Sequence, residues 1–314
     1  AFQHFALSAD KKHATGPGVI DNKGGIVTLL FALKALHNVG ELKNANITVV
    51  LTGDEELAEK PTNISRKALI DAAKDRDIAL GFEFSLSPDE LVVGRRGLSE
   101  WFLTSTGKSQ HSSTIFQSTV GFGAIFELSR VLNAIRSELS QTPGLTINPG
   151  LLLGGQKVRE DRKEEVGIVN GKKTVIAAQG LVHGDMRFLT EAQRDNAEKM
   201  MVNIAHYSLS GTQSTFTFHH FMPVMMATEA NQQLLSKLSA ISKKLGGPTL
   251  QASPPETRGG ADISYIARDV PANLDSLGPW GEGAHSQKET LNLDSLLIVT
   301  RRTALFIRQH ILEN

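Results

Sequence analysis

The chain has 314 residues, 33 Lys and Arg against 33 Asp and Glu, and no cysteine. Its 40% hydrophobic content supports a real core and excludes wholesale disorder, while the zero formal charge argues against a general nucleic-acid binder. The lack of cysteine excludes disulfides, thiolate zinc fingers and thiol nucleophiles. The apolar stretches fall short of the ~20 residues that span a bilayer. We therefore expect a soluble protein with no nucleic-acid or membrane partner, and the sequence does not decide between cytoplasm and periplasm.

The first third of the chain alternates between helical and strand patterns. Apolar spacing predicts a helix over residues 22–36, and a β-branched run predicts a buried strand over 46–52. A helix over 65–74 and a strand over 78–84 follow. This alternation predicts an α/β sheet with helices on its faces.

The middle of the chain has a different order, strand-helix-strand-strand-helix-strand, which is typical of a split βαβ unit. The predicted elements are strand 99–106, helix 118–137, strands 150–155 and 174–187, helix 190–208 and strand 214–220. The charged stretch 156–173 favours an exposed hairpin or loop.

Helical texture resumes after this block. The predicted elements are a helix over 231–245, a second helix opening at 258–262, a strand over 270–277 and a final helix over 293–312. We therefore predict one α/β domain built from residues 1–93 and 222–314, with an α+β domain inserted at 94–221.

Carboxylate and imidazole side chains stand at strand ends or in glycine-rich loops, at Asp21, Glu55, Glu56, Glu83 and His285. Ligands of open α/β sheets gather at the carboxyl ends of strands. Taken singly, each residue has an ordinary reading as a helix cap, a salt bridge or a solvated loop side chain. Adjacent carboxylates on extended backbone point opposite ways, so one can hold a metal while the other faces water. Together, carboxylates and an imidazole suit a divalent metal such as zinc.

The ordered set of motifs resembles the M20 metallopeptidase family, and within it the glutamate carboxypeptidase branch. The motifs occupy residues 16–25, 52–56, 82–83, 258–262 and 285–286, and their order and spacing match across essentially the whole chain. The resemblance implies a zinc-exopeptidase-like catalytic domain with an inserted dimerisation or lid domain. It also implies two Zn²⁺ ions as cofactors.

The resemblance implies metal-binding roles for four residues. Asp21 is implied to bridge the two zinc ions, with a cis peptide bond to Asn22. Glu56 and His285 are implied to bind one zinc ion. Glu83 is implied to bind the other.

The resemblance implies further roles in catalysis and substrate binding. Glu55 looks like the general base, and His111 like the histidine that reaches the partner subunit's active site and stabilises the oxyanion. Arg187 looks like the arginine that binds the substrate carboxylate. The backbone N–H groups of Gly259 and Gly260 are expected near the same carboxylate.

Two features depart from the family pattern. The upstream His-x-Asp motif, which supplies the remaining ligand of the zinc shared with Glu83, has no match here, and we expect N-terminal truncation rather than evolved loss. The Glu83-side metal is then expected to be weak or absent, and this chain impaired or inactive. Thr174 stands where the family commonly has a substrate-contacting Asn, which weakens any narrow substrate prediction.

The sequence thus predicts a zinc-dependent hydrolase of amide or peptide bonds, of the carboxypeptidase or exopeptidase type, acting on a small substrate with a free carboxylate. N-acyl amino acid deacylation by the same chemistry is the alternative. A catalytically inactive, truncated or peptide-binding homologue is the alternative of another class. A homodimer through the inserted domain is expected, because His111 is useful only in trans.

Overall fold

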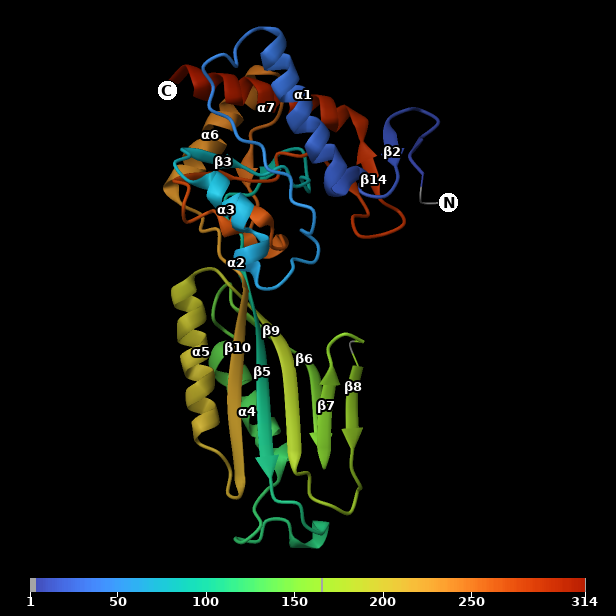
Figure 1. Ribbon diagram of the computed structural model, residues 1–314, viewed down its shortest axis with the longest axis vertical. Helices are drawn as coiled ribbons and strands as arrows, with labels where there is room; N and C mark the ends of the chain where they lie inside the picture. The colour runs from blue at the N-terminus through green and yellow to red at the C-terminus, as the bar shows by residue number, and fades with distance from the viewer. Residues whose placement is uncertain (1–3, 165, 314) are drawn as a thin grey trace. The chain divides into compact units, whose positions relative to one another are not determined.

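The computed structural model describes residues 4–164 and 166–313 and divides the chain into two compact units (Figure 1). The first unit joins Ala1–Arg95 with Met225–Asn314, and the second is Arg96–Val224. The sequence placed the boundaries after residues 93 and 221, whereas the contacts place them after residues 95 and 224.

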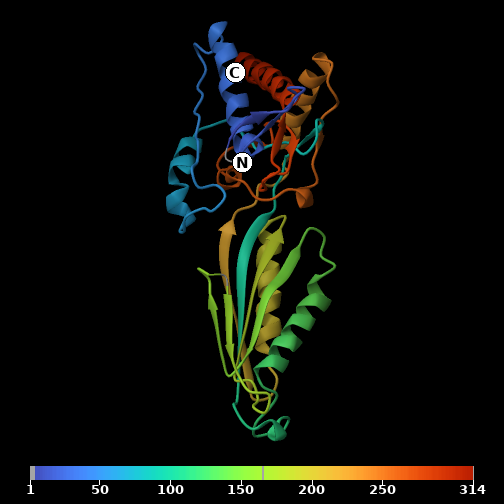
Figure 2. The ribbon, with the colours of Figure 1, turned by 90° about the vertical axis from the view of Figure 1, so that its right-hand side faces the viewer.

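The second unit is a four-stranded antiparallel sheet with two helices on one face (Figure 2). The strand order is β10-β5-β9-β6. Its elements are β5 (Gly97–Gly107), the short turn η2 (Ser112–Thr114), α4 (Ala124–Leu139), β6 (Thr146–Gly155), β7 (Lys157–Asp161), β8 (Val166–Asn170), β9 (Gln179–Phe188), α5 (Glu191–His206) and β10 (Thr212–Met222). The predicted β-α-β-β-α-β order is confirmed, and the charged stretch forms the predicted hairpin, β7 paired with β8.

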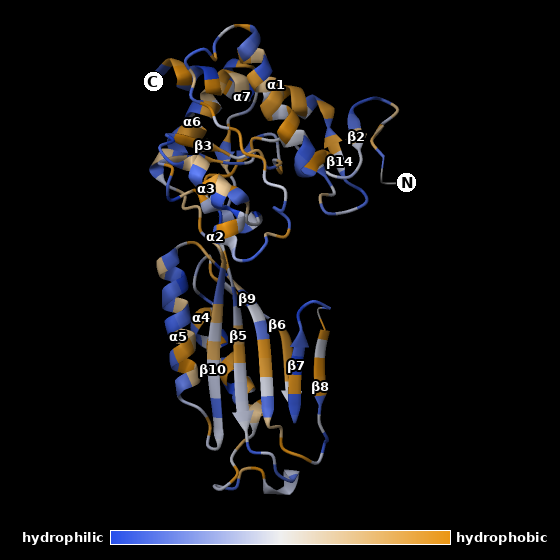
Figure 3. Ribbon diagram, viewed as in Figure 1, coloured by the Kyte–Doolittle hydropathy of each residue, from blue (hydrophilic) through white to orange (hydrophobic). Residues whose placement is uncertain are grey.

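Alternating side chains explain the core of this unit. Along β9, Val182, Met186 and Phe188 are buried in the core, whereas the alternate residues His183, Asp185 and Arg187 are only half-buried. Trp101 on β5 joins the same core and is fully buried. The two strands of the hairpin differ in hydropathy: β7 is hydrophilic, whereas β8 is largely hydrophobic (Figure 3).

Helices α4 and α5 begin where their flanking residues dictate. Helix α4 starts at Ala124 rather than at the predicted residue 118, because Gly121 (φ 88°) and Gly123 (φ 77°) hold the preceding backbone in the left-handed region. Helix α5 follows Thr190, the first residue of the helix predicted over 190–208, which serves as its N-cap: the Thr190 Oγ1 accepts the N–H of Gln193 at 3.0 Å.

The first unit is built from both ends of the chain. Its N-terminal elements are β1 (Ala6–Leu7), β2 (His13–Thr15), the turn η1 (Val19–Lys23), α1 (Gly24–Asn38), α2 (Thr62–Ser65), α3 (Lys67–Ala73), β3 (Ile78–Leu80) and β4 (Glu90–Leu91). Its C-terminal elements are α6 (Glu229–Lys244), β11 (Gln251–Ala252), η3 (Pro255–Thr257), η4 (Asp262–Tyr265), β12 (Ala272–Leu274), β13 (Gly281–Glu282), β14 (Thr290–Asn292) and α7 (Leu293–Glu313). Helices α1 and α7 pack against each other (Figure 1).

The strands of the first unit come together from distant segments. Strands β1, β2, β14 and β13 form an antiparallel sheet in that order, and the parallel pairs are β3 with β12 and β4 with β11. The apolar core around the two parallel pairs includes Leu274 of β12, Leu238 of α6 and Phe306 of α7. The chain leaves the carboxyl end of β3 toward Glu83 and the carboxyl end of β12 toward Asp275. Two acidic residues therefore lie just beyond a parallel strand pair.

The buried strand predicted over residues 46–52 is wrong. The segment has no regular secondary structure, and Ile47, Val49 and Leu51 are 41%, 40% and 62% exposed. Within the described ranges, no strand pairs with it. A strand exists only where a neighbour satisfies its N–H and C=O groups, so a β-branched run alone does not make one.

Two further observations concern the helices. The helix predicted to open at 258–262 is only the short turn η4. In the parts of the chain that the structure describes, no helix combines the length and apolarity that crossing a membrane requires.

Candidate metal centre

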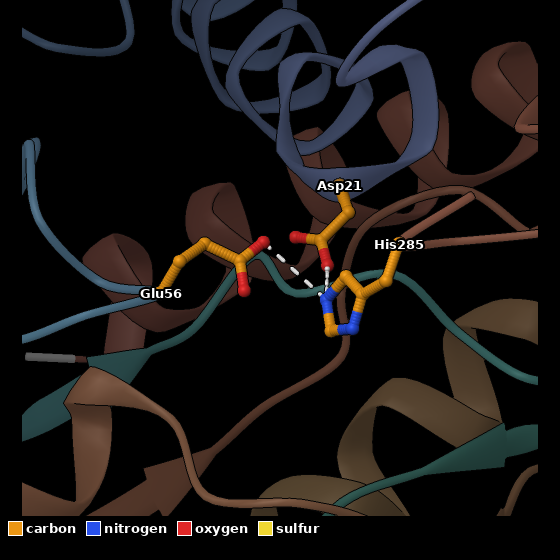
Figure 4. Close-up of side chains that lie close together, drawn as sticks. All are labelled: Asp21, Glu56 and His285. Carbon is orange, nitrogen blue, oxygen red and sulfur yellow. Dashed lines mark hydrogen bonds and ion pairs between the residues drawn. The ribbon is translucent and has the colours of Figure 1, made fainter. Parts of the chain in front are cut away.

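Three of the predicted site residues converge on one point (Figure 4). His285 Nε2 lies 2.9 Å from Asp21 Oδ2 and 3.3 Å from Glu56 Oε1, and one ligand atom from each residue lies within 4.8 Å of the others. The residues come from the turn η1, the loop before α2 and the loop between β13 and β14. The Asp21 side chain is 12% exposed, whereas those of His285 and Glu56 are about two thirds exposed. The cluster is therefore open to a small molecule or an ion.

The backbone around Asp21 is shaped by glycine and by close packing. Gly18 has φ 72°, in the left-handed region that favours glycine, and the peptide bond from Asp21 to Asn22 is cis, as the resemblance implied. At the start of α1, a Cβ on Gly25 would lie 2.0 Å from the carbonyl oxygen of Phe82. Only glycine allows this approach, which brings the Asp21 turn beside the segment after β3.

Glu83 lies next to this cluster but outside the group of three. Its Oε1 accepts the Nδ2–H of Asn22 at 3.3 Å. Burial, together with the charges of Asp275, Asp21 and Glu55, raises the pKa of the Glu83 carboxyl to about 8. Its predicted role as ligand of a second metal stays a prediction.

Glu55, the residue before Glu56, is half-buried. Burial, and then the charges of Asp262, Glu56 and Asp21, raise the pKa of the Glu55 carboxyl to about 7. A carboxyl with this pKa exchanges a proton near neutrality, as a general base must.

The loop that carries Glu55 and Glu56 is braced by Arg66, a residue for which no role was predicted from the sequence. The Arg66 side chain is fully buried, and its Nη1 lies 2.6 Å from Asp54 Oδ1. Its Nη2 donates to the carbonyl of Asp54 at 3.0 Å, and its Nε lies 2.7 Å from Asp262 Oδ1. One guanidinium thus ties the residue before Glu55 to the start of η4.

The glycines expected to bind a substrate carboxylate are held through their carbonyl groups. Arg95 Nη1 donates to the carbonyls of Gly259 at 2.7 Å and Gly260 at 3.4 Å. The same guanidinium forms a buried ion pair, with Nε 2.8 Å from Asp275 Oδ2. The role of the Gly259 and Gly260 N–H groups stays a prediction.

His111 and Arg187 belong to the second unit and have local partners there. His111 Nδ1 lies 2.8 Å from Ser113 Oγ. On β9, Arg187 Nε donates to Asp185 Oδ2 at 3.3 Å, and the Arg187 side chain is 40% exposed. Their roles toward the oxyanion and the substrate carboxylate stay predictions.

Solved structures of peptidases share the fold. A tripeptidase from Staphylococcus aureus matches with a TM-score of 0.71 at 17% identity, over 99% of this chain and 77% of that chain. An M20 metallo-carboxypeptidase from Sulfolobus solfataricus matches with a TM-score of 0.70 at 16% identity, over 98% and 79%. The YXEP protein of Bacillus subtilis, described as a dinuclear metal binding peptidase of the M20 family, matches with a TM-score of 0.60 at 14% identity, over 90% and 70%. This chain therefore shares the fold of these solved peptidases.

The sequence identifies the family. The model of peptidase family M20/M25/M40 matches residues 3–309, and the chain belongs to this family. Carboxypeptidase G2 of Pseudomonas sp. strain RS-16 is 28% identical over 286 residues, which cover 90% of this chain and 63% of that protein. The family and the fold class predicted from the motifs are thereby confirmed.

Proposed function

We propose that this chain belongs to a metal-dependent hydrolase that cleaves peptide or amide bonds in small substrates with a free carboxylate, with zinc as the metal. The observation that carries the proposal is the convergence of Asp21, Glu56 and His285 beside Glu55. Membership of a peptidase family supports it, and similarity to Carboxypeptidase G2 favours a carboxypeptidase-type substrate.

The three converging side chains fit a divalent cation. Two carboxylates and one imidazole are ligands that Zn²⁺ takes in catalytic sites, and their donor atoms already lie within 4.8 Å of one another. Bound here, the ion would supply Lewis acidity, which lowers the pKa of water and polarises an amide carbonyl.

Glu55 is the proposed general base. With a pKa of about 7 it is about half ionised at neutral pH and mostly ionised above it, and the ionised form can take a proton from the attacking water and pass it to the leaving nitrogen. Arg66 donates a hydrogen bond to the backbone carbonyl of Asp54, the residue before Glu55, and so restricts the position of the Glu55 backbone. The position of Glu55 matters because a general base must lie within hydrogen-bond distance of the proton that it takes.

The second unit supplies the remaining proposed groups. Arg187, half-exposed on β9, has a guanidinium suited to paired hydrogen bonds with a substrate carboxylate. We further propose a homodimer in which His111 serves the active site of the partner subunit. Loss of one oxyanion donor typically costs about 10²–10³ in rate, so His111→Ala in such a dimer is expected to lower kcat by that factor.

A substrate panel with one variant and one control tests the function. Zinc-loaded chain is assayed with dipeptides and with N-acetyl amino acids, because a carboxypeptidase prefers the first group and an N-acyl amino acid deacylase the second. Glu55→Gln is expected to lower kcat at least ~10²-fold and to leave zinc affinity nearly unchanged. Exposed Glu59 lies four residues away, and Glu59→Gln is the matched control. Equal turnover by Glu55→Gln and wild type refutes the assigned base, and no turnover of the whole panel by wild type favours the inactive alternative.

A further inference from the structure

The turn that carries Asp21 is held from outside by one buried carboxylate. Glu289 is 5% exposed and immediately precedes β14. Its Oε2 accepts the N–H of Gly18 at 2.7 Å, and its Oε1 accepts the N–H groups of Ile20 at 2.9 Å and Asp21 at 3.0 Å. Three backbone donors of one turn therefore converge on a single side chain.

This arrangement is favourable for both partners. A buried carboxylate is costly unless hydrogen bonds compensate it, and hydrogen bonds to an ionised acceptor are stronger than neutral ones. The backbone N–H groups are stabilised as well, because an N–H group shielded from water costs free energy unless it has an acceptor. Within the turn itself, the Val19 N–H donates to the Gly16 carbonyl and the Lys23 N–H to the Gly18 carbonyl. Glu289 accepts hydrogen bonds from other N–H groups of the turn, which these two bonds do not use.

Glu289 also lies on the segment that carries His285. A short turn joins them, in which Ser286 N–H donates to the carbonyl of Gly283 at 3.1 Å and Glu289 N–H to that of Ser286 at 3.3 Å. The next residue, Thr290, pairs with Thr15 of β2. Glu289 therefore links the backbone of Asp21 to the segment of His285, whose Nε2 lies 2.9 Å from Asp21 Oδ2.

We propose that Glu289 is a positioning residue of the metal centre: by holding the N–H groups of Gly18, Ile20 and Asp21, it places the Asp21 carboxylate against His285 and so sets the affinity of the site for a divalent cation. The inference rests on the proposed function, because the ligands are those of the proposed centre. Outer partners that orient metal ligands typically change metal affinity about 10–100-fold when they are mutated.

Two substitutions separate positioning from charge. Glu289→Gln keeps the size of the side chain but turns an NH₂ group toward a backbone donor. Glu289→Asp keeps the charge but withdraws the carboxylate by one methylene. Positioning predicts that both variants lose affinity, whereas a purely electrostatic effect predicts that Glu289→Asp retains it. Exposed Glu282, on the neighbouring β13, provides the control Glu282→Gln, which removes the same charge without touching the turn.

The experiment is calorimetric titration of chelator-treated full chain with Zn²⁺. We expect Glu289→Gln and Glu289→Asp to bind ~10–100-fold more weakly than wild type, and Glu282→Gln to bind within about twofold of it. His285→Ala is titrated in parallel as a test of the centre itself. Wild-type affinity in both Glu289 variants, with binding lost in His285→Ala, overturns the role of Glu289 alone, whereas wild-type affinity in His285→Ala overturns the metal centre.

Amide hydrogen exchange tests the contact without a variant that has to fold. In wild type, the amides of Gly18, Ile20 and Asp21 are expected to exchange much more slowly than those of the exposed segment 46–52, because each donates to Glu289. Equally fast exchange in both segments overturns the proposal.

Discussion

The two units differ in how their strands are stabilised. In the second unit, β5 and β9 pair along their whole length, from Gly97 opposite Phe188 to Thr106 opposite Gln179. In the first unit, residues 46–52 are richer in β-branched residues than β5 or β9, but they have no regular structure and expose Leu51. A β-strand therefore requires both a suitable sequence pattern and a neighbouring strand whose backbone groups pair with its own.

The largest effects test this difference directly. Trp101→Ala is expected to destabilise the second unit by about 3–5 kcal/mol, because it empties a fully buried site and frees the carbonyl of Asp185, which accepts the indole N–H at 3.0 Å. Leu51→Ala, at a 62% exposed position, is expected to cost less than ~0.5 kcal/mol. Urea unfolding measures both. A cost above 2 kcal/mol at Leu51 would mean that the segment 46–52 is packed.

The brace at Arg66 should be the strongest single contact of the loop before α2. Arg66→Met removes two ion pairs from a fully buried guanidinium and is expected to cost about 3 kcal/mol. The neighbouring Lys67 pairs with Asp71 at the surface, so Lys67→Met is expected to cost under ~1 kcal/mol. Similar unfolding free energies for the two variants would contradict the brace.

The two units are expected to respond to pH with opposite sign. In the first unit, the raised pKa of Glu83, about 8 against 4.5, means that the folded chain holds this proton more tightly than the unfolded chain. That stability is complete below pH 4.5 and is lost as pH rises through about 8. Glu83→Gln should therefore flatten a loss on the order of 3 kcal/mol between pH 5 and pH 8 in the metal-free chain.

In the second unit, Glu127 has the opposite behaviour. Burial alone would raise its pKa, but hydrogen bonds from Arg130, the Leu209 N–H and Ser214 hold the pKa of this carboxyl below its usual value. Its contribution is present above pH 4.5 and is lost as pH falls. Glu127→Gln should weaken the second unit most at neutral pH, and a loss that grows toward acid pH would contradict this assignment.

The smallest expected effects come from helix caps, one in each unit. Thr190 caps α5 by accepting the N–H of Gln193, and Thr228 caps α6 by accepting the N–H of Asn231 at 3.2 Å. Each Thr→Ala change is expected to cost about 1 kcal/mol. Thermal unfolding measures both costs, and an unchanged midpoint for either variant would contradict the cap at that position.

Sequence patterns were sufficient for the second unit because its signals are local. Alternating burial along β9 and the cap at Thr190 act within a few residues, and the strand predicted over 174–187 and the helix predicted over 190–208 overlap β9 and α5. The parallel strands of the first unit depend on partners nearly two hundred positions away, as with Ile78 beside Ala272, so their extent could not be predicted locally.

The site shows the same limit. Asp21, Glu56 and His285 stand in motifs, and the structure brings these three together. Glu289 and Arg66 carry no motif of their own, because their significance depends on which N–H groups and carboxylates face them in three dimensions. A single buried acidic or basic residue in a loop is part of no periodic sequence pattern. Its role becomes visible only when the folded structure shows its hydrogen-bond partners.

A Co²⁺ titration followed by visible absorption tests directly whether Asp21, Glu56 and His285 bind a metal ion. The account predicts one site per chain with a d–d spectrum that disappears in the double variant Asp21→Asn/His285→Ala. The control His37→Ala, at an exposed histidine of α1, should keep that spectrum. The same spectrum and affinity in all three proteins would contradict a metal centre at Asp21, Glu56 and His285.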